Sequence, residues 1–180
     1  MHIFDRFAGL TALLLLLLPA AGQAALATGA KAPMFDTRAS LAGKDFDLSL
    51  AQALKKGPVV LYFFPASFTP GCTIEANEFA KATEEFSKYG ATVIGMAADP
   101  IEKLNQFSVK ECRNKFAVGV ATPAMVEGYD VAFALVPGRT NRTSYVIAPG
   151  GKIVYAYSAL SPSGHINGTL AAVKAWAAKK

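Results

Sequence analysis

One segment of the chain combines a cysteine with neighbours that suit thiol chemistry. Cys72 stands in the sequence Phe-Pro-Ala-Ser-Phe-Thr-Pro-Gly-Cys-Thr-Ile-Glu, between an apolar run and a helical pattern. This position predicts that Cys72 lies in the first turn of a helix. Unpaired backbone N–H groups and the positive end of the helix dipole stabilise a thiolate over a thiol there. The segment therefore predicts a reactive cysteine, and a buried, inert small side chain is the alternative interpretation.

The elements around Cys72 alternate between strands and helices. Pro58 to Phe64 is a continuous apolar run, which predicts a strand buried on both faces and ended by Pro65. Apolar residues at helical spacing then predict a helix from Thr73 to Tyr89, with Gly90 as its stop. Ala91 to Ala98 predicts a second buried strand. This alternation places Cys72 at a strand-to-helix junction, where α/β proteins expose functional groups.

The second half of the chain continues the same pattern. Asp99-Pro100-Ile101-Glu102 supplies a cap, a proline and an acidic residue, which predicts a helix to about Lys115. Further strands are predicted at 116–120, 144–148 and 153–157, the last two joined by a Pro-Gly-Gly-Lys turn, and an amphipathic helix follows to Ala177. The predicted fold class is α/β, a central mixed sheet flanked by helices. Residues 29–57 carry weak signals and receive no assignment.

Composition narrows the class of protein. Of the 180 residues 52% are hydrophobic and 17% are charged, which argues against disorder and for one globular domain. The net charge is +5, but the basic residues are scattered, so nucleic-acid binding is not expected. Two cysteines are too few for a disulfide scaffold or a Cys-rich zinc site, and no metal or cofactor is predicted. They suffice for one redox pair.

The N-terminal segment predicts export. An uncharged run from Phe7 to Leu18 contains six consecutive leucines and is followed by small residues. It is shorter than the roughly 20 residues that a spanning helix needs. We therefore interpret residues 1–24 as a signal peptide cleaved after Ala24, with Ala25-Leu26-Ala27 as a second possible site and an uncleaved anchor as the alternative. Residues 25–180 form the single mature domain, in an oxidising compartment that we interpret as a bacterial periplasm.

The motif around Cys72 resembles that of a known family. Pro65, Thr69 and Cys72 stand at the spacing of the peroxiredoxin signature, and Phe-Thr-Pro-Gly-Cys-Thr at 68–73 is similar to the Q-type (bacterioferritin-comigratory) branch. Ala32–Phe35 resembles the opening of that family, and Arg142–Ile147 resembles its arginine strand. The resemblance implies a thioredoxin-like fold and a thiol-dependent peroxidase, an antioxidant oxidoreductase that reduces hydrogen peroxide and small organic hydroperoxides.

The resemblance also implies a role for each residue. Cys72 would be the nucleophile, whose thiolate attacks a peroxide oxygen and becomes a sulfenic acid. Thr69 would hold the peroxide, Arg142 would supply positive charge, and Pro65 would shield the pocket from water. Taken singly, Thr69 is also compatible with a turn residue, Pro65 with a strand stop and Arg142 with a surface charge.

The second cysteine is implied as the resolving residue. Many Q-type members carry that cysteine five residues after the nucleophile, where this chain has Asn77, so resolution within the first helix is excluded. Other members place it on the next helix, which here carries Cys112. The pair would form an intramolecular disulfide after some movement, and an inert, packed Cys112 is the alternative. An external thiol (a thioredoxin-like protein, glutathione or another) would then reduce the enzyme, expected as a monomer or weak dimer.

Other candidates are weaker. His165 is the only histidine outside the predicted signal peptide, and its Ser-Gly-His context is interpreted as solvated. The chain has no Cys-x-x-Cys, which argues against a thioredoxin-type disulfide exchanger. A non-enzymatic exported thioredoxin-like binding module, with a structural Cys72–Cys112 disulfide, remains the second functional class.

Overall fold

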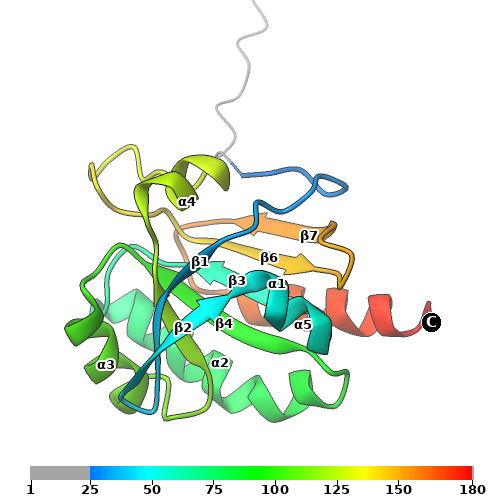
Figure 1. Ribbon diagram of the computed structural model, residues 1–180, viewed down its shortest axis with the longest axis horizontal. Helices are drawn as coiled ribbons and strands as arrows, with labels where there is room; N and C mark the ends of the chain where they lie inside the picture. The colour runs from blue at the N-terminus through cyan, green and yellow to red at the C-terminus, as the bar shows by residue number, and fades with distance from the viewer. Residues whose placement is uncertain (1–24, 180) are drawn as a thin grey trace, which may run out of the picture.

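A sheet of seven strands forms the centre of the computed structural model, which describes residues 25–179 (Figure 1). The predicted signal peptide lies outside the described residues. The strands run in the order β2-β1-β5-β4-β3-β6-β7. Their bounds are β1 Asp36–Leu41, β2 Lys44–Ser49, β3 Val59–Phe63, β4 Thr92–Ala97, β5 Ala117–Val120, β6 Thr143–Ile147 and β7 Ile153–Ser158. The helices are α1 Leu50–Lys56, α2 Pro70–Ser87, α3 Ile101–Lys110, α4 Pro123–Gly128 and α5 His165–Ala177.

Strand β3 is buried on both faces because helices cover both sides of the sheet. Val60 and Tyr62 point into an apolar cluster that includes side chains of α2, α3 and α5. Val59, Leu61 and Phe63 point into a second cluster that includes side chains of α1 and α4. Successive side chains of a strand face opposite sides of the sheet. The uninterrupted apolar run at 59–63 therefore supplies both halves of the core, as the sequence predicts.

Strand direction brings three segments to one edge of the sheet. β3 is parallel to β4 and antiparallel to β6. The last residue of β3, Phe63, pairs with Met96 near the end of β4 and with Thr143 at the start of β6. The chain leaving β3 toward Cys72, the chain leaving β4 at Asp99 and the chain entering β6 at Arg142 consequently meet at this edge.

Most predicted elements are confirmed, with two corrections near the site. The α/β class, the mixed sheet and the β6–β7 hairpin are as expected. The helix predicted to reach Lys115 ends at Lys110, so Cys112 lies in the turn beyond α3 rather than on it. Asp99 does not cap that helix, whose N-cap position is Pro100. Elements β1, β2, α1 and α4 were not predicted.

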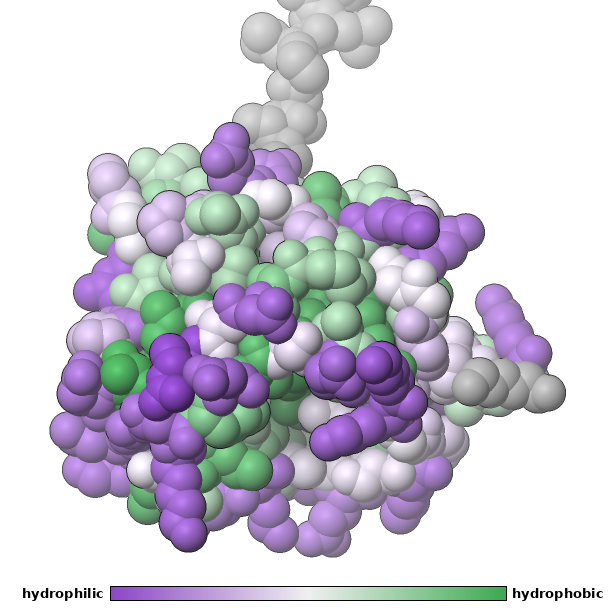
Figure 2. All heavy atoms as spheres, viewed as in Figure 1, coloured by the Kyte–Doolittle hydropathy of each residue, from purple (hydrophilic) through white to green (hydrophobic). Residues whose placement is uncertain are grey.

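A pocket of about 470 Å³ lies at the opposite edge of the sheet. Figure 2 shows hydrophobic side chains gathered in the middle of the face that carries α1 and β2, with hydrophilic side chains around them. The pocket lining includes Phe46, Leu48, Ala53 and Thr92, the residue at which β4 begins. It contains none of the predicted site residues, because these follow the other ends of β3 and β4. No helix within residues 25–179 is long and apolar enough to cross a membrane.

Candidate active site

The loop between β3 and α2 presents Cys72 at a helix start. Helix α2 begins at Pro70, with Thr69 at the N-cap position, so Cys72 lies in the first turn as predicted. Phe68 has a positive φ of 65°, which turns the chain from the strand into the helix. The Thr69 hydroxyl donates to the Ala66 carbonyl (3.0 Å) instead of capping the helix. Its oxygen therefore keeps acceptor capacity at the exposed mouth of the loop.

Arg142 contacts the sulfur of Cys72 across the sheet edge. Its Nη2 donates to Cys72 Sγ at 3.4 Å, and both side chains are buried, with Cys72 1% exposed and Arg142 4% exposed. Gly71 makes this approach possible, because a Cβ atom there would stand only 3.1 Å from Arg142 Nη2. A guanidinium this close stabilises the thiolate over the thiol. The surface-charge interpretation of Arg142 is thus wrong.

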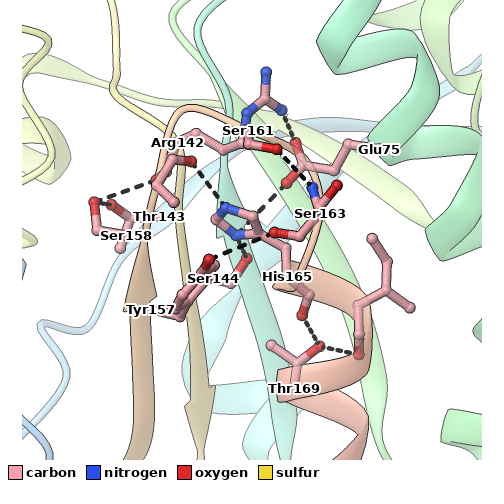
Figure 3. Close-up of polar contacts among 12 residues, drawn as sticks. Glu75, Arg142, Thr143, Ser144, Tyr157, Ser158, Ser161, Ser163, His165 and Thr169 are labelled. Atoms are coloured by element: carbon pink, nitrogen blue, oxygen red, sulfur yellow. Dashed lines mark hydrogen bonds and ion pairs between the residues drawn. The ribbon is translucent and has the colours of Figure 1, made fainter.

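The guanidinium of Arg142 is held by two further groups. Nε donates to the Leu160 carbonyl at 2.8 Å, and Nη1 forms a hydrogen-bonded ion pair with Glu75 Oε2 (Figure 3). Leu160 follows β7, whereas Glu75 lies on α2 one turn after Cys72. These partners orient the guanidinium so that Nη2, its remaining terminal nitrogen, contacts Cys72 Sγ.

Glu75 and His165 form a buried pair behind Arg142. Both side chains are fully buried, and Glu75 Oε1 lies 3.7 Å from His165 Nδ1. His165 also bonds Ser144 Oγ through Nδ1 (2.8 Å) and the Ala159 carbonyl through Nε2 (3.0 Å). Burial raises the pKa of Glu75 to about 8, against the opposing effect of Arg142. Burial, aided by the charge of Arg142, lowers the pKa of His165 to about 4. The expectation that His165 is solvated is wrong, because it opens α5 with its ring turned into the core.

Asp99 fastens the loop that carries Thr69. Its Oδ2 accepts the backbone N–H of Ser67 at 2.6 Å, and its Oδ1 accepts Arg139 Nη1 at 2.6 Å and Lys103 Nζ at 3.1 Å. Burial by itself would raise the pKa of Asp99, but these bonds hold it below the ordinary value. The carboxylate therefore ties the end of β4 to the loop before α2 and to the segment before β6.

Cys112 is buried in the turn after α3. It is fully buried in the same apolar cluster as Cys72, and neither cysteine forms a disulfide in this structure. Burial, with a smaller contribution from Glu111, raises the pKa of the Cys112 thiol well above its ordinary value. Asn77 Nδ2 donates to Glu111 Oε2 at 2.9 Å, which fastens this turn to α2. In this conformation Cys112 is a poor nucleophile.

Comparison with known proteins identifies the family. The model of the AhpC/TSA family matches residues 28–156, a range that includes Cys72, Thr69 and Arg142. The chain belongs to the AhpC/TSA family. It is 30% identical over 131 residues to Peroxiredoxin Bcp of Xanthomonas campestris, which covers 66% of this chain and 78% of that protein. It is 34% identical over 152 residues to the chloroplastic Peroxiredoxin Q of Oryza sativa, 79% of this chain and 64% of that protein.

A solved structure agrees with these AhpC/TSA relatives. Peroxidoxin BcpB from Mycobacterium tuberculosis superposes with a TM-score of 0.73 at 28% identity, over 82% of this chain and 96% of that one. The predicted thioredoxin-like peroxiredoxin fold is confirmed. The resemblance to the Q-type branch and the enzyme class, a thiol-dependent peroxidase, are confirmed with it.

The structure brings Pro65, Thr69, Cys72 and Arg142 to one edge of the sheet, as the motif requires, and leaves Cys112 in the core below it. The sequence did not predict that Glu75, His165 and Asp99 lie at the site. A signal existed for Glu75, since it stands three residues after Cys72 and therefore on the same side of the helix. His165 had no local signal, because its burial depends on how α5 packs on α2.

Proposed function

We propose that this AhpC/TSA protein reduces hydrogen peroxide and small organic hydroperoxides with Cys72 as the nucleophile. The contact that carries the proposal is the one between Arg142 Nη2 and Cys72 Sγ, at 3.4 Å in the first turn of α2. A helix start and a guanidinium acting on one sulfur both favour the thiolate. The thiolate is the form of cysteine that attacks peroxides.

The proposed reaction transfers one oxygen to sulfur. The Cys72 thiolate attacks one peroxide oxygen, the S–O bond forms as the O–O bond breaks, and Cys72 becomes a sulfenic acid. The second oxygen leaves as hydroxide or alkoxide and takes up a proton, so water or an alcohol is released. The free acceptor capacity of Thr69 Oγ1 suits it to accept a hydrogen bond from the peroxide. Pro65 is half-buried and has no N–H, and its proposed role is to shield the loop from water.

Cys112 is proposed to resolve the sulfenic acid within the same chain. Its thiol displaces water from the sulfenic acid, which forms the Cys72–Cys112 disulfide, and an external thiol then reduces that bond. Both cysteines lie in one apolar cluster on the same side of the sheet. The burial of Cys112 and the Asn77–Glu111 hydrogen bond imply that the turn after α3 must loosen first. A disulfide requires Cα atoms within about 7 Å.

A non-enzymatic module with a structural disulfide is disfavoured. Such a bond needs no cation on its sulfur, whereas Arg142 is aimed at Cys72. We also propose that the protein is exported to a periplasm after cleavage near Ala24, which rests on the leucine-rich segment at 13–18.

The proposal is tested by peroxide consumption with dithiothreitol as reductant. Cys72→Ser will abolish turnover, because an alcohol is far less acidic than a thiol. Arg142→Ala will slow it strongly, and Arg142→Lys will recover only part, because a point charge does not reproduce the planar fork. Full activity in Cys72→Ser would remove the enzyme assignment from this site. Equal thiolate absorbance at pH 7 in wild type and Arg142→Ala would remove Arg142 from it.

A further inference from the structure

The two carboxyl oxygens of Glu75 have different surroundings. Oε2 accepts a hydrogen bond from Arg142 Nη1. Oε1 has no hydrogen-bond donor within residues 25–179, although the side chain is fully buried. Figure 3 shows that the carboxyl group lies between the Arg142 guanidinium and the His165 ring, and Oε1 is 3.7 Å from Nδ1. A buried ionised oxygen without a donor is costly, so this oxygen is the natural place for a proton.

The partners of His165 determine which of its nitrogens faces that proton. Nε2 lies 3.0 Å from the Ala159 carbonyl oxygen, which can only accept, so Nε2 carries a hydrogen. In the neutral ring Nδ1 then holds a lone pair, which accepts from Ser144 Oγ at 2.8 Å. The same nitrogen faces Glu75 Oε1. An acid and a base, both buried, thus stand next to each other behind the cation that contacts Cys72.

We propose that Glu75 and His165 together hold one proton at neutral pH, so that the pair is electrically neutral and the charge of Arg142 acts on the Cys72 sulfur. The net charge is zero whether the proton resides on Oε1 or on Nδ1. Both residues are positioning residues, since they act through Arg142. The effect of the pair on the Cys72 thiolate rests on the proposed function, whereas the proton held by the pair does not. Burial drives both groups toward their neutral forms, consistent with the raised pKa of Glu75 and the lowered pKa of His165.

Arg142 makes the charge of the pair matter to Cys72. One guanidinium donates through Nη1 to the carboxyl group and through Nη2 to the sulfur. With the proton present, one cation faces one anion, the thiolate. When the proton leaves, two anions compete for the same cation, and each disfavours the other. Ionisation of Cys72 and deprotonation of the pair are therefore coupled.

Other groups around the pair leave this coupling intact. The charge of Glu75 acts on Tyr62 of β3, and burial raises the pKa of Tyr62 well above the ordinary value. Tyr157 on β7 packs edge-on against the His165 ring, with centroids 4.7 Å apart. Arg142, in the segment before β6, contacts Glu75 through Nη1 and Cys72 through Nη2. Among these groups of the described chain, Arg142 is the cation, and it contacts both Glu75 and Cys72.

The location of the proton is measured without peroxide turnover. The experiment uses reduced protein in a Cys112→Ser background, infrared spectra for a protonated carboxyl band and nitrogen NMR of the His165 ring. At pH 7 we expect either the carboxyl band or an imidazolium, and its loss as the pH is raised toward 9. Glu75→Gln will remove the band, whereas Glu78→Gln, an exposed site on the same helix, will keep it. An ionised Glu75 together with a neutral His165 at pH 7 overturns the proposal.

Titration of the Cys72 thiolate tests the coupling. Because glutamine cannot ionise, the thiolate absorbance of Glu75→Gln will follow a one-site curve, while wild type and Glu78→Gln will follow a broader curve. Coincident curves in all three proteins overturn the coupling. If circular dichroism shows that Glu75→Gln does not fold, the infrared and NMR spectra of the Cys112→Ser protein as a function of pH test the proposal by themselves. A protein that holds the proton on the pair but reduces no peroxide contradicts only the proposed function, and the converse result contradicts only this inference.

Discussion

Raising the pH from about 6.5 to 8 will destabilise the folded protein through Glu75 and His165. The ordinary pKa values are 4.5 and 6.5, and the folded values are about 8 and about 4. Between pH 6.5 and 8 the folded pair holds one proton that the unfolded chain has released, so the free energy of unfolding falls as the pH rises. At roughly 1.4 kcal/mol per pH unit the loss is about 2 kcal/mol over this window. Between 4.5 and 6.5 both states hold one proton, and the pair contributes no slope.

Glu75→Gln will change how the free energy of unfolding depends on pH. Of the pair, only His165 then titrates, and its lowered pKa means that the unfolded chain binds the extra proton below about pH 6.5. Stability will be level from 6.5 to 8 and will fall as the pH drops toward 4, by about 3 kcal/mol in all. Urea unfolding of both proteins from pH 4.5 to 8.5 measures the difference, with Glu78→Gln as a control that should follow wild type. Parallel profiles for wild type and Glu75→Gln would refute the reasoning.

Three further changes test other parts of the site. Cys112→Ser will still react with one equivalent of peroxide but will accumulate sulfenic or sulfinic acid at Cys72, seen by mass spectrometry; lack of a Cys72–Cys112 bond in oxidised wild type would contradict this scheme. Asp99→Asn will lower the free energy of unfolding by about 1–3 kcal/mol and slow peroxide reduction, because the Ser67 N–H loses a charged acceptor, whereas Lys103→Ala will cost less than about 1 kcal/mol. Protein purified from an exporting bacterial host will begin at or near Ala25 by mass, and a persistent full-length chain would favour the uncleaved anchor.

Local sequence was sufficient to place Cys72 and the strand and helix next to it. The apolar run at 59–63, the Pro-Gly turn and the helical spacing after Thr73 each depend on neighbours in the chain, and they place Cys72 in the first turn of α2. The strands and helix within residues 29–57 were not predicted, because their local sequence signals are weak. Strands β1 and β2 are short and partly charged, and they form because they pair with each other and β1 pairs with β5, not because of intrinsic preference.

The charges around the Cys72 sulfur were decided by tertiary structure. The family resemblance pointed to Arg142, but only the antiparallel pairing of β6 with β3 carries it to Cys72, a residue 70 positions earlier. His165 looked solvated because Ser163 and Gly164, which precede it, are polar and small, yet the packing of α5 against α2 buries its ring beside Glu75. The sequence thus determined which cysteine lies at a helix start. The tertiary structure decided which charged groups surround its sulfur, because electrostatic energy depends on through-space distance and burial, and separation along the chain encodes neither.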